Sequence, residues 1–489
     1  MLVLALDVGT SSARARVYDE RGRARPGAEG HVVYEPRTTP DGGVELDADS
    51  LIDAIARAID ECLAGCGEAA RDIAGVGASV FWHSLLGLDG SGRALTPVLT
   101  WADTRSAAAA QALRRELDEG AVHKRTGAPI HSTFFPAKLR WLRETRPEVF
   151  GRAARWCGFA ELLQARLTGS MQCSLSMASG TGLLDQERGG WDRAMLEAAG
   201  ISADALPPID DEAAPGLIAP WAERWPALAR VPWYPAHGDG ACSNVGSGCS
   251  GPDGIALNVG TSAALRVVLA EGLGAHRATP TGLWRYRVDG RRALVGGATS
   301  EGGNVLAWCR KTLALPAGDA ALEQALAAVP PDSHGLTALP FLAGERSPGW
   351  RPEARAALAE LSLATDAVEI ARALLEAVAL RLAEIYDRLR PFAAADHRVI
   401  GSGGALGHSP TWAQVIADAI GVPIGLGTDA EASTRGAAVL ALEALGVEAP
   451  PPADPVRILR PDPANHARYR AARARQLRLY DNIVGFQDS

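Results

Sequence analysis

The sequence has few of the features that mark nucleic-acid-binding, disulfide-rich or membrane proteins. Its 49 basic and 57 acidic residues are spread without long runs of one sign, and the formal net charge is −8, which argues against a nucleic-acid-binding surface. No segment reaches the roughly 18 uncharged apolar residues that a membrane-spanning helix needs. The seven cysteines are scattered, and no Cys-x-x-Cys pair occurs. Neither a disulfide framework nor a zinc site is therefore predicted, and a reducing cytoplasm is expected.

The length and the start of the chain set two further expectations. The start, MLVLALDVGT, has no basic n-region and places Asp7 inside the apolar stretch, which differs from a signal peptide. A chain of 489 residues with 47% apolar content is long for one hydrophobic core. Two domains of roughly 200 to 250 residues each are expected.

Strand-like and helix-like segments alternate along the chain, which is typical of an α/β protein. A hairpin is predicted over residues 2–18, with Gly9 at its turn. A first helix is expected after Asp49 and Ser50, which can cap it. Other expected elements are an Ala-rich helix over about residues 103–117, strands around 255–268 and 283–296, a long helix near 367–389, and a helix that starts after Ser409 and ends at Gly421.

One stretch of sequence occurs twice, as LALDVGTSSARARV at 4–17 and as IALNVGTSAALRVV at 255–268. A strand, a Gly-Thr-Ser turn and a returning strand expose consecutive backbone N–H groups and two hydroxyls, which can bind phosphate oxygens. Two copies in two halves predict twin domains that hold a polyphosphate between their hairpins. A single Mg²⁺ needs a carboxylate from only one copy. Asp7 is therefore predicted on the metal side, with Asn258 as its uncharged counterpart.

These two motifs resemble the phosphate motifs of the FGGY carbohydrate kinases, and the similarity runs over nearly the whole chain. The resemblance implies the actin and sugar-kinase (hexokinase-like) fold, with two RNase H-like domains of five-stranded sheets and with ATP and Mg²⁺ in the cleft between them. We place the domains at residues 1–243 and 244–489. The segment GSGGALGHSPTWAQVIAD at 401–418 is similar to the family's adenosine segment. The nucleotide-binding residues implied by the resemblance are Thr10, Ser11, Ser12, Arg14, Gly260, Thr261, Ser262, Gly403, Gly404, Ala405 and Ser409.

The segment HGDGACSNVG at 237–246 resembles the family segment that carries the catalytic base. The resemblance implies that Asp239 accepts the proton of the attacking hydroxyl and, with Asp7, helps to order the metal through water. Transfer of the ATP γ-phosphate needs an in-line hydroxyl, a metal that bridges the β- and γ-phosphates, and a proton acceptor. Taken alone, Gly-Asp-Gly would be a turn.

Segments of the N-terminal half look closer to gluconokinases than to xylulokinases. They are VFWHSLLGLDGSG at 80–92, WADTRS at 101–106 and RTGAPIHSTFFPAKLRWL at 125–142. His83 matches the family pattern, whereas Trp82 replaces the usual Met and Phe135 stands where a small residue is expected. The implied reaction converts D-gluconate to 6-phosphogluconate.

Gluconate is a linear polyol with a carboxylate, so its site should contain hydroxyl-binding groups and at least one cation. We rank Lys138 first as this cation, then Arg105, then His131. The residues expected to bind the substrate are His83, Trp101, Asp103, Arg105, His131, Lys138 and Asp239.

Other functions stay open at this point. Xylulokinase, or another pentulose or polyol kinase of the family, is the main alternative. A non-kinase ATPase of the same fold group, such as a chaperone or filament protein, would share the hairpins but would not need a base at Asp239. A sugar-responsive repressor would need an added helix-turn-helix arm. We expect a small sugar or sugar acid as the partner, with no nucleic acid and no membrane, and we leave a homodimer open.

Overall fold

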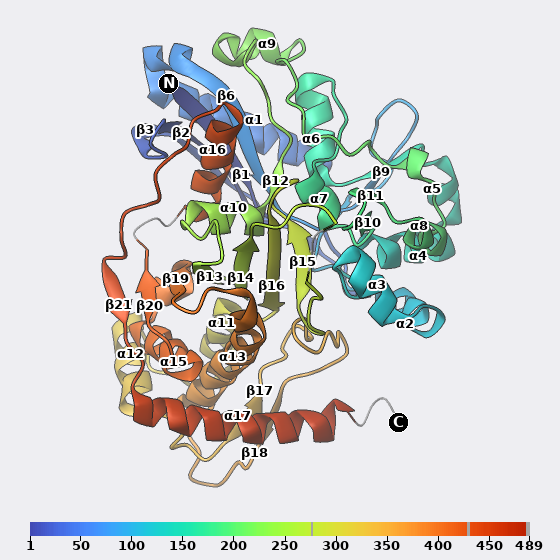
Figure 1. The fold of residues 1–489 in the computed structure, drawn as a ribbon. Helices are drawn as coiled ribbons and strands as arrows, with labels where there is room; N and C mark the ends of the chain where they lie inside the picture. The colour runs from blue at the N-terminus through green and yellow to red at the C-terminus, as the bar shows by residue number, and fades with distance from the viewer. Residues whose placement is uncertain (275–276, 428–430, 486–489) are drawn as a thin grey trace.

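The structure is a computed structural model that describes residues 1–274, 277–427 and 431–485. Two β-sheets form its frame, one in each half of the chain, and helices surround both (Figure 1). The predicted α/β fold with two RNase H-like domains is confirmed. Within the described residues, we find no helix that combines the length and the apolar character needed to cross a membrane.

The N-terminal sheet has the strand order β12-β6-β1-β2-β3. Strand β1 pairs antiparallel with β2 and parallel with β6. All seven residues of β1 are buried, because the strand lies at the centre of a sheet that helices cover. The strands are β1 (Leu2–Val8), β2 (Ser12–Asp19), β3 (Ala24–Val33), β6 (Ile73–Val80) and β12 (His237–Gly238).

The C-terminal sheet has seven strands in the order β15-β16-β14-β13-β19-β20-β21. Its five central strands repeat the order and the directions of the N-terminal sheet, since β13 pairs antiparallel with β14 and parallel with β19. The edge strands β15 and β21 are additions to the expected five. The strands are β13 (Gly254–Val259), β14 (Ala263–Leu269), β15 (Trp284–Arg287), β16 (Ala293–Thr299), β19 (Arg398–Ser402), β20 (Ile424–Leu426) and β21 (Arg457–Leu459).

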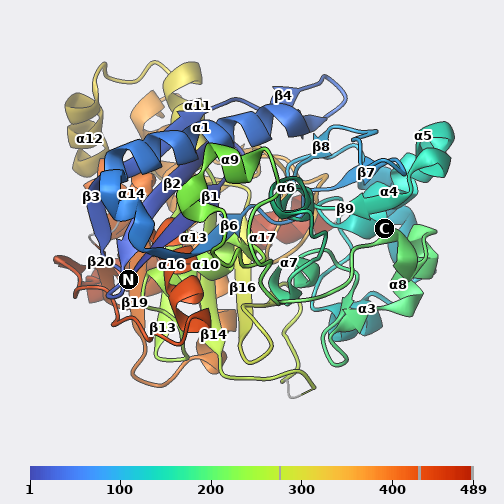
Figure 2. The same cartoon turned by 90° about the horizontal axis from the view of Figure 1, so that it is seen from above.

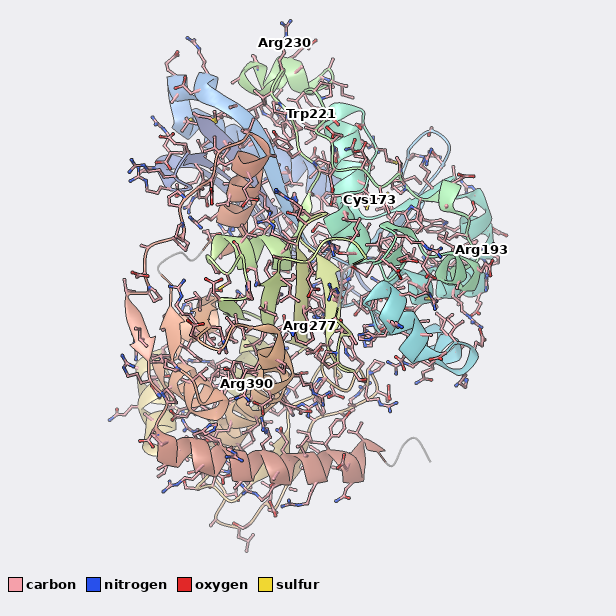
Figure 3. The ribbon with its side chains drawn as sticks, viewed as in Figure 1. Cys173, Arg193, Trp221, Arg230, Arg277 and Arg390 are labelled. Atoms are coloured by element: carbon pink, nitrogen blue, oxygen red, sulfur yellow. The ribbon has the colours of Figure 1, made fainter. Side chains whose placement is uncertain are left out.

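A lobe inserted between β6 and β12 carries the segments with the predicted substrate residues. Figures 1 and 2 both place it to one side of the sheets. Cys173 is buried on the side of the lobe that faces the N-terminal core, and Arg193 lies at its outer rim (Figure 3). Its elements are β7 (Leu86–Leu88), β8 (Val98–Leu99), α2 (Ala107–Glu116), α3 (Glu119–Thr126), α4 (Phe135–Thr145), α5 (Pro147–Arg152), β9 (Arg155–Cys157), α6 (Phe159–Thr168), α7 (Leu175–Ser179), β10 (Leu184–Asp185), β11 (Gly190–Trp191), α8 (Arg193–Ala199) and α9 (Trp221–Arg224).

The remaining helices and short strands complete the two halves. The predicted long helix is α13, over the expected residues, and the predicted helix after Ser409 is α15, which ends at a left-handed Gly421. The elements are β4 (Arg37–Thr38), β5 (Val44–Leu46), α1 (Ala48–Cys66), α10 (Asp239–Gly246), α11 (Gly303–Thr312), α12 (Asp319–Ala328), β17 (Thr337–Leu339), β18 (Ala357–Ala359), α13 (Ala367–Leu389), α14 (Gly404–His408), α15 (Pro410–Ile420), α16 (Ala432–Ala444) and α17 (Pro463–Ile483).

Two helix starts differ from the sequence expectation. Helix α1 begins at Ala48, because Asp47 and not Asp49 caps it by accepting a hydrogen bond from the backbone N–H of Ser50 at 2.9 Å. Helix α2 begins at Ala107, four residues later than expected. Asp103 cannot join it, because its carboxylate accepts a hydrogen bond from the N–H of Val44 at 3.2 Å.

Helices α10 and α16 cross where the two halves of the chain meet, and their backbones touch. A Cβ atom on Gly246 would lie 1.8 Å from the carbonyl oxygen of Ala432, and one on Gly436 would lie 1.8 Å from that of Cys242. Only glycine permits this approach. Helix α16 packs on β1 and β6, so the N-terminal core includes a helix from the last quarter of the chain.

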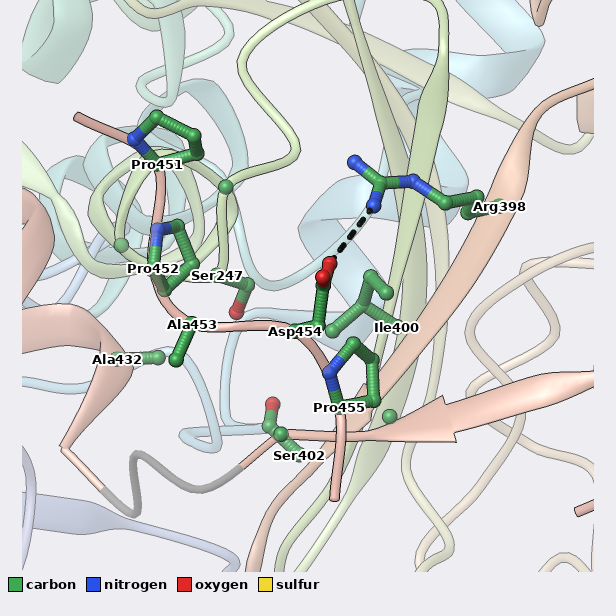
Figure 4. A pocket seen from close by; sticks show the side chains of 14 residues that line it. Ser247, Arg398, Ile400, Ser402, Ala432, Pro451, Pro452, Ala453, Asp454 and Pro455 are labelled. Carbon is green, nitrogen blue, oxygen red and sulfur yellow. Dashed lines mark ion pairs between the residues drawn. The ribbon is translucent and has the colours of Figure 1, made fainter. Parts of the chain in front are cut away.

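A proline-rich segment, residues 451–455, lies next to the crossing of α10 and α16. Pro451 and Pro452 lie beside the end of α10, and Arg398 pairs with Asp454 at 3.7 Å (Figure 4). The guanidinium of Arg435 in α16 donates to the carbonyl of Gly246 at 2.9 Å and to that of Gly22 at 3.1 Å. These contacts fix α16 between the two halves.

We expect Gly436→Ala to lower the free energy of unfolding by about 1 to 3 kcal/mol, since the added methyl group would force α10 and α16 apart. Urea unfolding followed by circular dichroism measures the effect. Gly151→Ala is the matched control, because Gly151 lies in α5 with no atom within 4 Å of the added carbon. An unfolding midpoint for Gly436→Ala equal to that of the wild type would contradict the close crossing.

Candidate active site in the interdomain cleft

The two repeated motifs form hairpins that line one cleft of about 300 Å³. Residues 9–12 connect Val8 with its strand partner Ala13 in the first hairpin, and residues 260–262 connect Val259 with its partner Ala263 in the second. Each turn is closed by a hydrogen bond of 2.9 Å from its glycine N–H. The first turn is one residue longer, which the matching letters of the two motifs conceal. The cleft therefore presents the turns of both halves, as the duplication predicts.

A polar pair at the base of each hairpin repeats the same geometry. Asp7 lies opposite Ser79 on the parallel strand β6, and the hydroxyl of Ser79 donates to its Oδ1 at 2.8 Å. Asn258 lies opposite Ser402 on β19, and its amide donates to Oγ of Ser402 at 3.1 Å. The two halves thus differ at this position chiefly by one negative charge.

The environment of Asp7 suits a cation. Burial raises the pKa of Asp7 to about 6, against the lowering effect of the Ser79 hydrogen bond and of the Arg14 charge. The guanidinium of Arg14 lies 3.6 Å from Asp7 and 3.3 Å from Glu431. The negative charge of Asp239 also raises the pKa of Asp7, so two carboxylates face the same region. Carboxylate oxygens are ligands that Mg²⁺ prefers, and Asp7 and Asp239 fit such an ion.

Asp239 is the first residue of α10 and lines the cleft together with both hairpins. The Gly-Asp-Gly sequence is thus a strand-to-helix junction and not a turn. A Cβ on Gly238 would lie 1.8 Å from the Trp82 ring, and one on Gly240 would lie 2.7 Å from it, so both glycines let this ring pack beside the carboxylate. Burial raises the pKa of Asp239, and the charge of Arg266 partly offsets this effect. A raised pKa makes the carboxylate a better proton acceptor.

A second cavity, of about 610 Å³, adjoins the cleft between α11, α12 and α14. Gly260 and Thr261 line both cavities, so an elongated ligand can extend from one into the other. Of the predicted adenosine residues, Gly404, Ala405 and Ser409 line this cavity. Gly403 has φ +99°, and a Cβ there would lie 2.4 Å from the carbonyl oxygen of Val259.

The turn residues predicted to bind phosphate all line the cleft, and their binding of phosphate stays a prediction. They are Thr10, Ser11, Ser12, Arg14, Gly260, Thr261 and Ser262.

Of the predicted substrate residues, His83, Trp101 and Asp239 line the cleft. His83 has φ +65°, an uncommon backbone conformation that occurs often at functional sites. Burial and the charge of Arg346 hold the pKa of His83 well below its ordinary value, so its ring is neutral at pH 7. Its Nδ1 lies 2.5 Å from the carbonyl oxygen of Gly180.

The structure corrects the ranking of Lys138 as the first partner of a substrate carboxylate. Its ammonium is 1% exposed and donates to the carbonyl oxygens of His83 at 2.6 Å, Thr100 at 2.7 Å and Leu99 at 3.5 Å. All three N–H groups therefore have partners. Burial lowers the pKa of Lys138 to about 7. Lys138 fixes the loops that carry His83 and Trp101 and does not reach the cleft.

Arg105 and Asp103 also have a structural role, since they join the segment around residue 103 to residues 44 and 45. The guanidinium of Arg105 pairs with Glu45 at 2.9 Å and with Asp103 at 2.5 Å, and neither residue lines the cleft. His131 is buried and does not line the cleft, and its ring forms a T-shaped contact with the ring of Trp350. Its Nε2 atom has no hydrogen-bond partner in the described part of the chain.

Two arginines that the sequence did not single out line the cleft. Arg266 is the lone charge in strand β14, and Arg346 lies in the segment LPFLAGERSPGW. The Nε and Nη1 atoms of Arg266 and the Nε atom of Arg346 are buried without a hydrogen-bond partner among the described residues. A lone charge in an otherwise apolar strand was the one available signal for Arg266. Beside them, Trp284 and Tyr286 of β15 stack with ring centroids 4.2 Å apart.

Residues 2–246 match the model of the N-terminal domain of the FGGY family of carbohydrate kinases, and residues 255–445 match the model of its C-terminal domain. The chain belongs to this family. FGGY kinases transfer a phosphoryl group to an alcohol, so the chain is a phosphotransferase with a carbohydrate acceptor.

Similar proteins act on different sugars. The gluconokinase of Bacillus subtilis (strain 168) is 28% identical in an alignment of 467 residues that covers 91% of this chain and 88% of that protein. The crystal structure of the gluconate kinase from Lactobacillus acidophilus superposes with a TM-score of 0.87 at 26% identity, covering 99% of this chain and 98% of that one. The ligand-bound xylulose kinase from Lactobacillus acidophilus gives a TM-score of 0.88 at 26% identity, with the same coverage.

Because Asp7 carries a charge and Asn258 does not, substitutions in the first hairpin should change the Mg²⁺ dependence of activity, whereas substitutions in the second should not. We expect Asp7→Asn to depress activity severely, with partial recovery at high Mg²⁺, and Asn258→Ala to leave the Mg²⁺ optimum unchanged.

In the wild type, activity should fall as the pH falls through about 6, where Asp7 gains a proton and loses its charge. Added Mg²⁺ should move this fall to lower pH, because cation and proton compete for one carboxylate.

Initial rates measured over a grid of pH and Mg²⁺ concentration test both statements. Equal Mg²⁺ dependence in the two variants would contradict the assignment of the metal side to Asp7.

Proposed function

We propose that this FGGY kinase phosphorylates D-gluconate to 6-phosphogluconate, with ATP as the donor and Mg²⁺ as the cofactor. The observation that carries the proposal is the charge of the cleft. Asp239 lines the cleft together with the two hairpins, and so do two guanidinium groups that have no hydrogen-bonded carboxylate partner in the described part of the chain. An anionic acceptor supplies the missing negative charge, whereas a neutral sugar does not. The similarity to the gluconokinase of Bacillus subtilis supports the same substrate.

The residues of the cleft divide the chemistry among them. The backbone N–H groups and hydroxyls of the two turns hold the phosphates of ATP. Asp239 accepts the proton of the attacking hydroxyl, and its raised pKa favours that transfer. Asp7 and Asp239 would hold Mg²⁺, which would supply positive charge against the charge that develops on the phosphoryl oxygens. The rings of Trp82, Trp284 and Tyr286 cover the reacting groups and exclude water.

Xylulose is the second candidate, because a xylulose kinase superposes as well as a gluconate kinase does. The backbone fold therefore does not decide between gluconate and xylulose, so the choice must rest on the side chains of the cleft. Xylulose carries no charge, so the guanidinium group that the phosphates of ATP do not neutralise would keep no anionic partner, which is unfavourable for a buried charge.

ADP release measured against a panel of gluconate, xylulose, ribulose, glycerol and erythritol tests the proposal. We expect the highest kcat/KM with gluconate. A kcat/KM for xylulose well above that for gluconate would overturn the choice of substrate and leave the kinase assignment intact.

The role of Asp239 makes a separate prediction. We expect Asp239→Asn to lower kcat by about 10² to 10⁴, the usual contribution of general-base catalysis, and to leave the KM for ATP nearly unchanged. Asp204→Asn, which removes a charge from an exposed residue of the lobe, is the control. An Asp239→Asn variant that keeps more than about a tenth of the wild-type kcat would remove Asp239 from this role.

A further inference from the structure

The substrate end of the cleft, lined by His83, Trp101 and Arg346, contains one guanidinium that contacts two aromatic rings. The Cζ atom of Arg346 lies 5.3 Å from the ring centroid of Trp101 and 5.9 Å from that of Trp350. Trp350 in turn contacts Phe134 and His131. Contacts with two rings restrict where the guanidinium can lie without occupying its N–H groups. Arg346 is therefore oriented but has donors to spare.

No acid of the described ranges forms an ion pair with Arg346. Its Nε atom has no hydrogen-bond partner among the described residues, and the carboxyl groups whose charge acts on its pKa are those of Asp239 and Glu301. Glu301 is 1% exposed, and its Oε1 accepts a hydrogen bond from the N–H of Ala343 at 3.1 Å. Burial raises the pKa of Glu301 to about 8, so Glu301 is mostly uncharged at pH 7. Asp239 is the proton acceptor in the proposed reaction and faces Arg266 as well.

The other cations around the cleft are already engaged or lie elsewhere. Arg14 pairs with Asp7 and Glu431. Arg266 lies beside the base, since a Cβ on Gly240 would stand 2.8 Å from its Nε. Arg266 therefore belongs to the end of the cleft where the phosphoryl group is transferred.

The histidines of the substrate end supply no charge. Burial and the charge of Arg346 hold the pKa values of His83 and His131 well below their ordinary value, and Arg114 contributes at His131. Arg346 is the one described residue lining the substrate end that is charged and has unpaired donors.

We propose that Arg346 binds the carboxylate of a sugar acid through its guanidinium fork and is the residue that selects acids over neutral polyols. This assignment rests on the proposed kinase function and names the class of its acceptor. A planar guanidinium matches a carboxylate with two parallel hydrogen bonds, which an ammonium cannot do. With the carboxylate at Arg346, the far end of the acceptor points toward Asp239 and the hairpins.

The test compares acid and neutral ligands of equal length within each variant. Dissociation constants of D-gluconate and sorbitol are measured by calorimetry for the wild type, Arg346→Met and Arg346→Lys, and KM for ATP is measured alongside. We expect the wild type to bind gluconate about tenfold to a hundredfold more tightly than sorbitol, as one charge-assisted pair gives. In Arg346→Met this ratio should fall to near one while the affinity for sorbitol changes less than about twofold, and Arg346→Lys should retain part of the ratio.

Arg71→Met is the matched control, because it removes the same charge from a side chain that is 78% exposed. A ratio taken within one variant does not depend on how much of the sample is folded. An unchanged ratio in Arg346→Met would overturn the proposal, and so would an equal loss for both ligands, which would place Arg346 with the phosphoryl group or with the packing of the wall. A wild type that binds neither gluconate nor any other sugar acid more tightly than the neutral polyol of equal length would also overturn it.

The choice of gluconate can fail separately from the role of Arg346. If a panel of other sugar acids shows one of them, and not gluconate, both bound with an Arg346-dependent preference and turned over, the proposed substrate is wrong and the role of Arg346 stands.

Discussion

The backbone contact between α10 and α16 is the constraint on which the cleft depends. Helix α10 begins with Asp239 and leads into β13, which carries Asn258, while α16 packs on the strands that carry Asp7 and Ser79. Because the two helices touch without intervening side chains, the hairpins of the two halves face each other across a fixed junction. A larger residue at Gly246 or Gly436 would displace the base and both phosphate turns together.

Buried charge is the second constraint, and it explains why the cleft must bind charged ligands. Asp7 and Asp239 repel each other, and among the residues that the structure describes no carboxylate is bonded to Arg266 or Arg346. Such an arrangement is unfavourable by itself. A metal ion on the acid side and an acidic acceptor on the arginine side would each relieve it, so the same imbalance accounts for the predicted cofactor and for the predicted substrate class.

The sequence predicts the features that depend on neighbours along the chain. The repeated hairpins, the helix 367–389 and the capped helix after Ser409 follow from local pattern, and the position of Asp239 follows from the family resemblance. The partners of Lys138 could not be predicted, because its three carbonyl acceptors belong to two other segments. The place of Arg346 depends on Trp101, which is far away in sequence, and the packing of α16 on the N-terminal sheet depends on contacts over more than 350 residues.

A crystal structure of the complex with a non-hydrolysable ATP analogue, Mg²⁺ and gluconate tests most directly whether one cleft between the hairpins holds both reactants. The account predicts the phosphates between residues 9–12 and residues 260–262, and the terminal hydroxyl of gluconate within about 2.6 to 3.2 Å of an Asp239 oxygen. Gluconate bound outside this cleft, or with its carboxylate toward Asp239 and its hydroxyl end away from the phosphates, would contradict it.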